Sequence, residues 1–323
     1  MVYTLDRTDL RILYELNKNS RIPDTKLAKL LKKSKESIRY RIKRLRAENI
    51  LNGFTIWVDP IKLGYTTRKI YLSLSNVPTL KEEFKKFVIK DNRLFWLGFA
   101  DGAWDAGLTY FVKNNKEFYD IKNELLSKFN ELITEVHTAE VVEIKKKPCT
   151  FLFKEDCQYI TLLDVVKTEI IDELDIKIIN ALFKDARTTL VELARLSEIT
   201  IDILRNRIKK LISKRIIVDY NALIDFEKIG YNFFKSFLYF KKINKQDELK
   251  LLEYCRVQQN IIYVLKQISP WDIELEIFCK SYQEYNLLIN NLKKEFSDII
   301  RKVDTAIINE NYVFPAGEIK IYY

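Results

Sequence analysis

The chain contains the same segment twice, and this internal repeat constrains its fold more than any other feature. Residues 5–74 align without a gap with residues 171–240, and 21 of the 70 aligned positions are identical. A repeat period of 166 residues is too long for a solenoid, so it indicates a duplicated pair of domains. At 323 residues the chain has room for two to four domains, each with its own core.

Each copy of the repeat begins with the pattern of a helix-turn-helix. In the first copy, apolar spacing predicts a helix at about 7–19 capped by Asp6, and a short helix that starts at Asp24 or Thr25. A third helix follows, with Ser34 as its cap. Gly53 ends this unit, and the run GFTIWVDP predicts a short strand, the wing of a winged helix. The second copy repeats the pattern.

Downstream of each helix-turn-helix, alternating and amphipathic runs predict a strand-helix-strand-strand-helix-strand series. This order is that of a ferredoxin-like domain. In the first copy we expect these elements at about 68–76, 79–90, 94–100, 105–113, 116–129 and 132–146. In the second copy we expect them at about 234–242, 245–258, 261–268, 272–279, 282–296 and 299–310.

The predicted fold class is therefore α+β, with two winged helix-turn-helix domains, each followed by a ferredoxin-like βαββαβ domain. The expected boundaries are 1–58 and 65–147 for the first pair, 148–168 for a linker, 169–224 and 231–311 for the second pair, and 312–323 for a C-terminal tail. Within the linker, the apolar run CTFLF at 149–153 is a candidate edge strand.

Composition narrows the classes of function. The only histidine is His137, which argues against imidazole-based metal sites and against Ser-His or Cys-His catalysis. The four cysteines have no metal-ligand spacing, so we expect structural thiols in a reducing cytosol, no metal and no cofactor. No apolar stretch approaches the roughly 20 residues of a membrane helix. The N-terminus does not have the pattern of a signal peptide, so we expect a cytoplasmic protein without a membrane partner.

The net charge of +10 is concentrated in the first repeat copy. Residues 1–54 hold 14 Lys or Arg against 6 Asp or Glu, whereas residues 167–220 hold 11 against 9. A clustered positive excess is typical of a surface that binds nucleic acid. The two helix-turn-helix copies are thus expected to bind DNA unequally, the first more strongly.

A helix-turn-helix that starts with LDxxDxxIL and precedes a βαββαβ domain resembles the Lrp/AsnC family of transcription regulators. The resemblance also includes the runs LAKLL, SIRYRIKRLRAENIL and GFTIWVDPIKLGY, and in the second copy LARL, ILRNRIKKLISKRII and DFEKIGY. Arg21 and Arg187, which precede the second helix of each copy, match the family as well. The resemblance implies DNA binding by the helix-turn-helix, pairing through the effector domain, and in many members an amino-acid effector.

In this context the third helix of each copy is the expected recognition helix, whose outward side chains contact phosphates and bases of double-stranded DNA. In the first copy the candidate DNA-binding residues are Lys35, Ser37, Arg39, Tyr40, Arg41, Lys43 and Arg44. In the second copy they are Thr200, Arg205, Asn206, Arg207, Lys209 and Lys210. Glu198 and Asp202 are acidic and repel phosphate, so we expect weaker DNA contact by the second copy. The alternative is that the second copy does not contact DNA and serves only as a structural partner of the first.

The family's effector domains carry a Gly-x-x-Asp turn, which Gly102 and Asp105 supply in the first copy. A free amide at such a turn can bind a ligand carboxylate, and an aspartate can bind its ammonium group. In the second copy Asp272 is retained but Pro270 removes one amide donor. A tight turn with tryptophan packed over it is the structural alternative at both positions.

Three functions remain open from the sequence. The first is a DNA-binding transcription regulator whose two effector domains pair within the chain, which makes it a covalent pseudo-dimer with possible further self-association; it is not an enzyme. The second is a DNA-packaging protein of low sequence specificity. The third is an enzyme similar to the siroheme decarboxylases, which resemble this family in fold and also occur as two fused units. Those enzymes rely on histidine and basic residues at the effector-domain interface, and neither copy has a histidine between its second and third strands.

Overall fold

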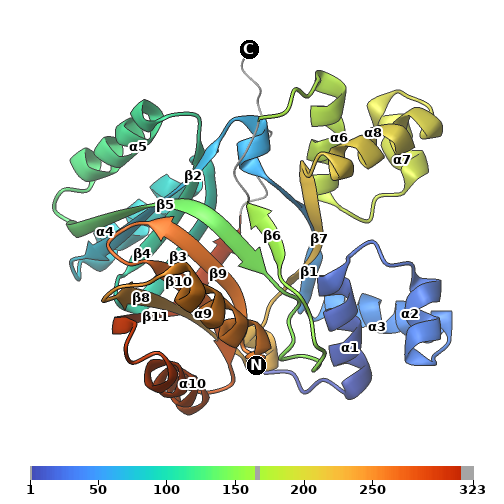
Figure 1. Cartoon of the computed structure of the whole chain (residues 1–323). Helices are drawn as coiled ribbons and strands as arrows, with labels where there is room; N and C mark the ends of the chain where they lie inside the picture. Colours follow the sequence, from blue (N-terminus) through green and yellow to red (C-terminus); the bar gives the residue numbers. More distant parts are fainter. Residues whose placement is uncertain (1, 164–167, 314–323) are drawn as a thin grey trace.

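Each copy of the repeat folds into a three-helix unit, one wing strand and one half of a shared sheet (Figure 1). The computed structural model describes residues 2–163 and 168–313. The first copy contains α1 (Arg7–Lys18), α2 (Asp24–Leu31), α3 (Lys35–Ala47), β1 (Leu51–Val58), β2 (Thr66–Leu74), α4 (Pro78–Ile89), β3 (Leu94–Gly102), β4 (Ala106–Val112), α5 (Asn115–Lys128) and β5 (Ile133–Lys146). After β6 (Ile160–Leu163), the second copy contains α6 (Glu173–Lys184), α7 (Leu190–Ser197), α8 (Ile201–Ser213), β7 (Ile217–Ile224), β8 (Asn232–Phe240), α9 (Lys245–Val257), β9 (Ile261–Ile268), β10 (Ile273–Cys279), α10 (Tyr282–Glu295) and β11 (Ile300–Val313).

The predicted order of elements is confirmed in both copies, and local signals explain the helix ends. The Asp6 side chain accepts a hydrogen bond from the Asp9 amide at 2.8 Å and so caps α1. Ser34 caps α3 by accepting from the Ser37 amide at 3.1 Å. Helix α2 begins at Asp24, as predicted, and Pro23 is its N-cap residue.

The wing strands do not form hairpins within their own units. Instead β1 pairs antiparallel with β7, its counterpart from the other copy, in a separate two-stranded sheet. Gly53 lies inside β1 and does not end the unit. The wings therefore join the two helix-turn-helix units to each other.

The two ferredoxin-like halves form one continuous sheet. Its strand order is β2-β4-β3-β11-β8-β10-β9-β5-β6, and β2 also pairs with β5. Eight of these strands therefore close into a ring, with β3–β11 and β5–β9 as the junctions between the copies. This arrangement confirms that the two effector domains pair within the chain.

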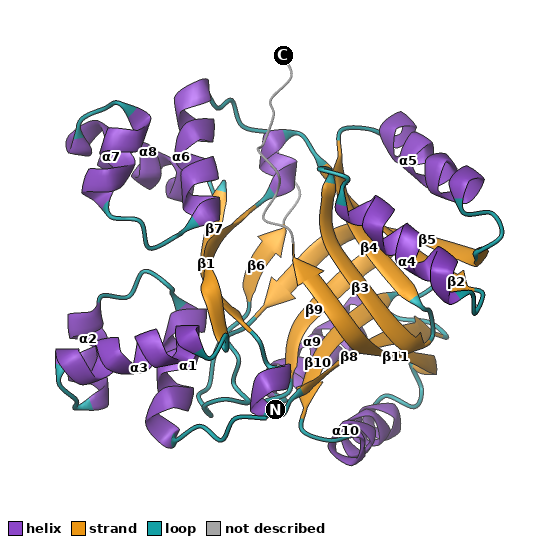
Figure 2. Cartoon of the chain, turned by 180° about the vertical axis from the view of Figure 1, so that it is seen from behind, coloured by secondary structure: helices purple, strands orange, loops and turns teal. Residues whose placement is uncertain are grey.

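Helices cover the outside of the closed sheet, and each copy has its own core there. Helices α4 and α5 pack on the first half and α9 and α10 on the second, while the three-helix units lie side by side at the other end (Figures 1 and 2). A third core, shared by both helix-turn-helix units and the wings, includes Leu13, Leu45, Ile179 and Leu211. None of the described helices is long and apolar enough to cross a membrane.

The segment after β5 and the end of the last strand differ from the expectation. The run CTFLF at 149–153 is not a strand; the added edge strand is β6, which pairs with β5. Cys149 and Leu152 are instead buried in the shared helix-turn-helix core, where apolar packing outweighs local strand propensity. The second expected series ends at 310, whereas β11 runs to Val313, and residues 314–323 of the expected tail lie outside the described residues.

Candidate nucleic-acid interface

The predicted recognition helices are α3 and α8. Helix α3 buries Ile38 and Leu45 against the core, and α8 buries the equivalent Leu204 and Leu211. Their outward faces carry most of the predicted DNA-binding residues. Exposed members are Arg39, Tyr40, Lys43, Thr200, Arg205, Asn206, Lys209 and Lys210. Half-buried members are Lys35, Ser37, Arg41, Arg44 and Arg207.

The half-buried arginines of α3 bind carboxylates of α1. Asp9 is almost fully buried, and its carboxylate pairs with Arg41 at 2.8 Å and with Arg44. Arg41 also pairs with the capping residue Asp6 at 2.7 Å. These ion pairs hold the recognition helix against α1, because a buried carboxylate needs charged hydrogen-bond donors. Burial of the Asp6 carboxyl opposes its ionisation, but hydrogen bonds from the Asp9 amide and from Arg41 outweigh this and lower its pKa.

The second copy has the equivalent ion pairs between its third and first helices, a clamp with fewer arginine donors. Arg207 pairs with the buried Asp175 at 3.1 Å and with the N-cap Asp172. Lys210, which replaces Arg44, is exposed. The exposed Arg205 pairs with Asp202 at 3.1 Å, and its counterpart Arg39 pairs with Asp24 at 3.2 Å, so the exposed arginine of each recognition helix has a carboxylate partner.

A set of reciprocal contacts fixes the two helix-turn-helix units around a local pseudo-twofold axis. Arg21 donates to the Ala186 carbonyl at 2.7 Å, and its counterpart Arg187 donates to the Ile22 carbonyl at 3.3 Å. The Ser20 amide donates to the backbone carbonyl of Tyr220 at 2.9 Å, and the equivalent Ala186 amide donates to the backbone carbonyl of Phe54 at 3.0 Å. Helix α1 packs on β7 and α6 on β1. Such self-complementary contacts are the signature of a two-fold dimer interface, here within one chain.

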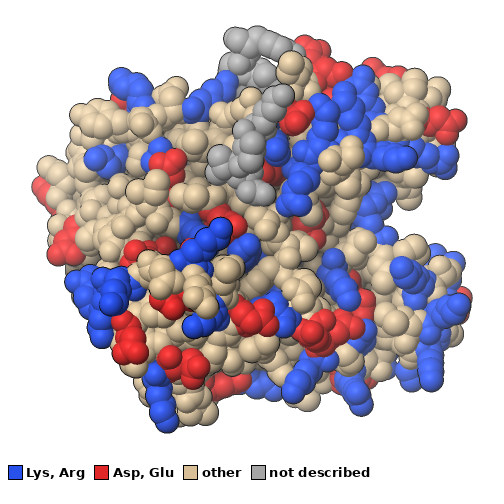
Figure 3. Space-filling model, viewed as in Figure 1, with Lys and Arg blue, Asp and Glu red and all other residues tan. Residues whose placement is uncertain are grey.

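The surface view shows how charge is distributed over this end of the molecule. A notch separates the two helix-turn-helix lobes, and Lys and Arg side chains lie on both lobes with some Asp and Glu among them (Figure 3). On the face seen in Figure 3, the basic side chains of the two lobes therefore lie on either side of the notch.

The predicted effector turn in the first copy is occupied by protein contacts. Gly102 has a φ of +119°, and a Cβ atom there would lie 2.3 Å from the Thr305 carbonyl oxygen of β11. The next amide, of Ala103, donates to that carbonyl at 2.8 Å. The Asp105 carboxylate accepts from the Leu74 amide at 2.7 Å. The turn thus serves the junction between the two halves of the sheet.

The second turn uses its aspartate in the same way. Asp272 accepts from the Phe240 amide at 2.8 Å, and its own amide donates to Leu238 at 2.9 Å. Trp104 and Trp271, which precede the two aspartates, are both buried inside the closed sheet around Tyr71. His137 lies on β5, as expected for a strand residue, with its ring 6.4 Å from that of Trp271.

The closed sheet also encloses a charged cluster that the sequence interpretation missed. Glu274 is fully buried, and its carboxylate binds Lys69 at 2.8 and 3.0 Å, Lys235 at 2.7 Å and the Tyr71 hydroxyl at 2.6 Å. Gln267 donates to it as well. Burial opposes ionisation, but Lys235 and Lys69 hold the pKa of Glu274 well below its ordinary value. Lys69 and Lys235 occupy equivalent positions of the repeat. The presence of lysine at both positions, within predicted strands, was the sequence signal that could have indicated this cluster.

Comparison with known proteins places these features in a family. The sequence profile of the AsnC-type helix-turn-helix domain matches residues 5–46 and 171–212. The chain is 30% identical over 149 residues to an uncharacterized HTH-type transcriptional regulator of Pyrococcus furiosus, covering 46% of this chain and 99% of that protein. It is 28% identical over 142 residues to the HTH-type transcriptional regulator LrpA of Pyrococcus abyssi, covering 43% and 97%.

A solved structure with the same two-unit layout is also similar. The siroheme decarboxylase NirDL, in complex with an iron-uroporphyrin III analogue, superposes with a TM-score of 0.64 at 13% identity, covering 95% of this chain and 92% of that one. At this identity the match shows the fold alone. The fold is that of a paired helix-turn-helix protein with fused effector domains. By its sequence relatives and its repeated AsnC-type domain, the chain belongs to the Lrp/AsnC family, as a tandem duplication of the family's unit.

Proposed function

We propose that this protein is a DNA-binding transcription regulator that acts as a covalent pseudo-dimer. The observation that carries this proposal is the reciprocal pairing of the two helix-turn-helix units through Arg21, Arg187 and the β1–β7 sheet. A family dimer presents two recognition helices to successive half-sites of an operator. Here one chain supplies both helices in a fixed relationship.

The exposed side chains of α3 and α8 give the proposed chemistry of recognition. Arginine binds guanine edges with two hydrogen bonds, asparagine binds adenine, and lysine binds phosphate. On α3, Arg39 can bind guanine and Lys43 can bind phosphate. On α8, Asn206 can bind adenine and Lys209 can bind phosphate. Because the first unit carries the larger positive excess, we expect it to provide most of the salt-dependent affinity.

Selection of bound fragments from sheared DNA of the source genome tests this function. A regulator enriches a small set of fragments that share a sequence motif, and a mutated motif binds at least about 1000-fold more weakly than the operator. A DNA-packaging protein binds with equal affinity to fragments of any sequence. Uniform recovery of fragments therefore contradicts the proposal and supports packaging.

We also propose that any amino-acid effector at the Gly102–Asp105 turn binds only with rearrangement of the sheet junction. The Asp105 and Ala103 groups already have partners on β2 and β11. Calorimetry with a panel of amino acids tests this. A tight site that is lost in Asp105→Asn places the effector at the turn.

A siroheme decarboxylase-like enzyme is a second candidate, favoured by the match to NirDL across both units. Mixing the chain with siroheme and recording the absorption spectrum tests this candidate. A shifted, saturable porphyrin band followed by loss of carbon dioxide from the substrate supports the enzyme. An unchanged spectrum removes it.

A further inference from the structure

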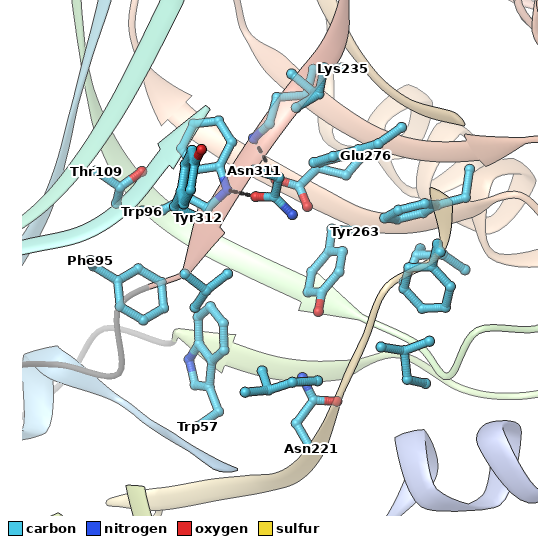
Figure 4. Close-up of a pocket in the computed structure, with 18 of the residues that line it drawn as sticks. Trp57, Phe95, Trp96, Thr109, Asn221, Lys235, Tyr263, Glu276, Asn311 and Tyr312 are labelled. Atoms are coloured by element: carbon cyan, nitrogen blue, oxygen red, sulfur yellow. Dashed lines mark hydrogen bonds and ion pairs between the residues drawn. The ribbon is translucent and has the colours of Figure 1, made fainter. Parts of the chain in front are cut away.

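A large cavity lies between the closed sheet and the wing strands. Its volume is about 900 Å³, within the range of small-molecule sites. Residues of β1, β3, β7, β8, β9 and β11 line it, so both copies of the repeat and both layers of the molecule contribute (Figure 4). It is separate from the Gly102–Asp105 turn, since neither turn residue lines it.

One side of the cavity is aromatic. Trp57 of β1 and Phe95 of β3 meet edge to face with ring centroids 5.4 Å apart, and Trp96 and Tyr312 lie beside them in Figure 4. Phe95 also stacks on Phe111 at 4.7 Å. Aromatic rings that line a cavity favour a flat ring system as ligand, which gains both apolar burial and ring contacts.

The opposite side of the cavity also carries polar groups. The Tyr263 hydroxyl and the Asn221 amide point into the space between the walls (Figure 4). Burial raises the pKa of Tyr263, which keeps its hydroxyl protonated as a donor. The Asn221 Oδ1 atom accepts from Asn17 at 3.1 Å and from Lys146 at 3.0 Å, so the amide nitrogen faces the cavity as a donor. On the aromatic side, Thr67, the cross-strand neighbour of Phe111, has a buried hydroxyl without a hydrogen-bond partner among the described residues.

The charges of the lining decide which ligands fit. Its two cationic residues in the described part of the chain, Lys69 and Lys235, are both paired with Glu274, and Lys235 also pairs with Glu276 at 2.6 Å. The acidic lining residues Glu276 and Glu310 are paired as well, with Lys235 and with Lys85. An anionic ligand would therefore meet these two cations with their carboxylate partners already in place.

We propose that this cavity binds a flat heteroaromatic small molecule that carries no net negative charge. Such a ligand lies between the aromatic wall and the donors of Tyr263 and Asn221. It contacts the wing strands, which carry the helix-turn-helix units, and the closed sheet at the same time. Occupancy therefore changes DNA affinity by shifting the wings relative to the sheet, a consequence that rests on the proposed regulator function.

Three planar dyes of different charge test the site in the full-length chain. Nile red is uncharged, thioflavin T is cationic and uroporphyrin III is a polycarboxylate. We expect the first two to bind with one molecule per chain and to quench tryptophan fluorescence, and uroporphyrin to bind at least about tenfold more weakly. Trp57→Phe should remove part of the quenching, since Trp57 lines the cavity.

A matched pair of aromatic truncations locates the site. Phe95→Ala removes a cavity wall, whereas Phe87→Ala removes a half-buried ring on α4, outside the closed sheet. We expect about a tenfold loss of Nile red affinity in the first variant and none in the second, with both folded by circular dichroism. Equal affinity in both variants, or uroporphyrin binding as tight as that of Nile red, overturns the proposal. Binding that appears only when the chain is ended at Val313 also overturns it, because the chain's own C-terminal segment is then the occupant.

DNA binding is measured separately, without dye, by fluorescence anisotropy. Failure there contradicts the regulator function and leaves the dye titrations unaffected. Dye binding that fails while DNA binding persists overturns the ligand site alone.

Discussion

At the scale of single residues, the arginines of α3 divide into two roles. Arg39 is 61% exposed at its side chain and pairs with Asp24, whose carboxylate also pairs with Arg187, whereas Arg41 is 21% exposed between Asp6 and Asp9. Both were predicted to contact DNA from their positions on the helix. Position could not distinguish them, because the clamp depends on where α1 packs.

Alanine substitutions should separate the two arginines. Arg39→Ala should reduce the slope of log affinity against log salt by about one, with a stability change within about 0.5 kcal/mol. Arg41→Ala should lower the free energy of unfolding by about 1–3 kcal/mol, because it takes a charged donor from the buried Asp9. Gel shifts across a salt series and urea titrations measure the two effects. A loss of stability in Arg39→Ala without one in Arg41→Ala contradicts this division of roles.

Glu274 makes the stability of the closed sheet depend on pH. Its pKa in the folded protein lies below the ordinary value of 4.5, so its stabilising effect is present above about pH 4.5 and is lost as the pH falls through the lowered pKa. Glu274→Gln leaves two buried lysines short of a counter-charge and should cost about 3–5 kcal/mol at pH 7. The variant should also show a shallower loss of stability between pH 5 and 3. Denaturant midpoints across pH, with the exposed Glu124→Gln as control, measure both.

At the scale of elements, the glycine turn after β3 joins the two halves of the sheet. Gly102→Ala should lower the free energy of unfolding by about 2–4 kcal/mol, since its Cβ would meet the Thr305 carbonyl and its φ disfavours alanine. Gly53→Ala is the matched control: its φ is also positive, but the nearest atom to its Cβ is 3.8 Å away. Thermal unfolding of both variants is the measurement. Equal destabilisation by the two would show that backbone conformation alone is responsible.

The elements also show what the sequence can and cannot predict. Helix ends were predictable within a few residues because caps such as Asp6 and Ser34 act locally. The pairing of β1 with β7 between the two copies was not predictable, since a strand pattern does not specify which strand is its partner. The buried Lys69–Glu274 pair was missed for the same reason: its partners lie 205 residues apart in the chain.

At the scale of the whole molecule, the closed sheet makes each half incomplete. Separation of the copies would expose the edges of β3 and β5 together with those of β11 and β9. Co-expressed fragments 1–150 and 165–323 should therefore associate in a one-to-one complex. Sedimentation measures this, and fragments that stay monomeric at micromolar concentration contradict the intramolecular dimer.

Hydroxyl-radical footprinting of the full chain on its selected operator tests the central claim most directly. One chain with two recognition helices should protect two segments about 10 base pairs apart, at a stoichiometry of one chain per operator. Substitutions of Arg39 and Lys43 should remove one protected segment, and substitutions of Arg205 and Lys209 the other. A single protected segment, or two segments that need two chains, would contradict a covalent pseudo-dimer with two DNA-binding units.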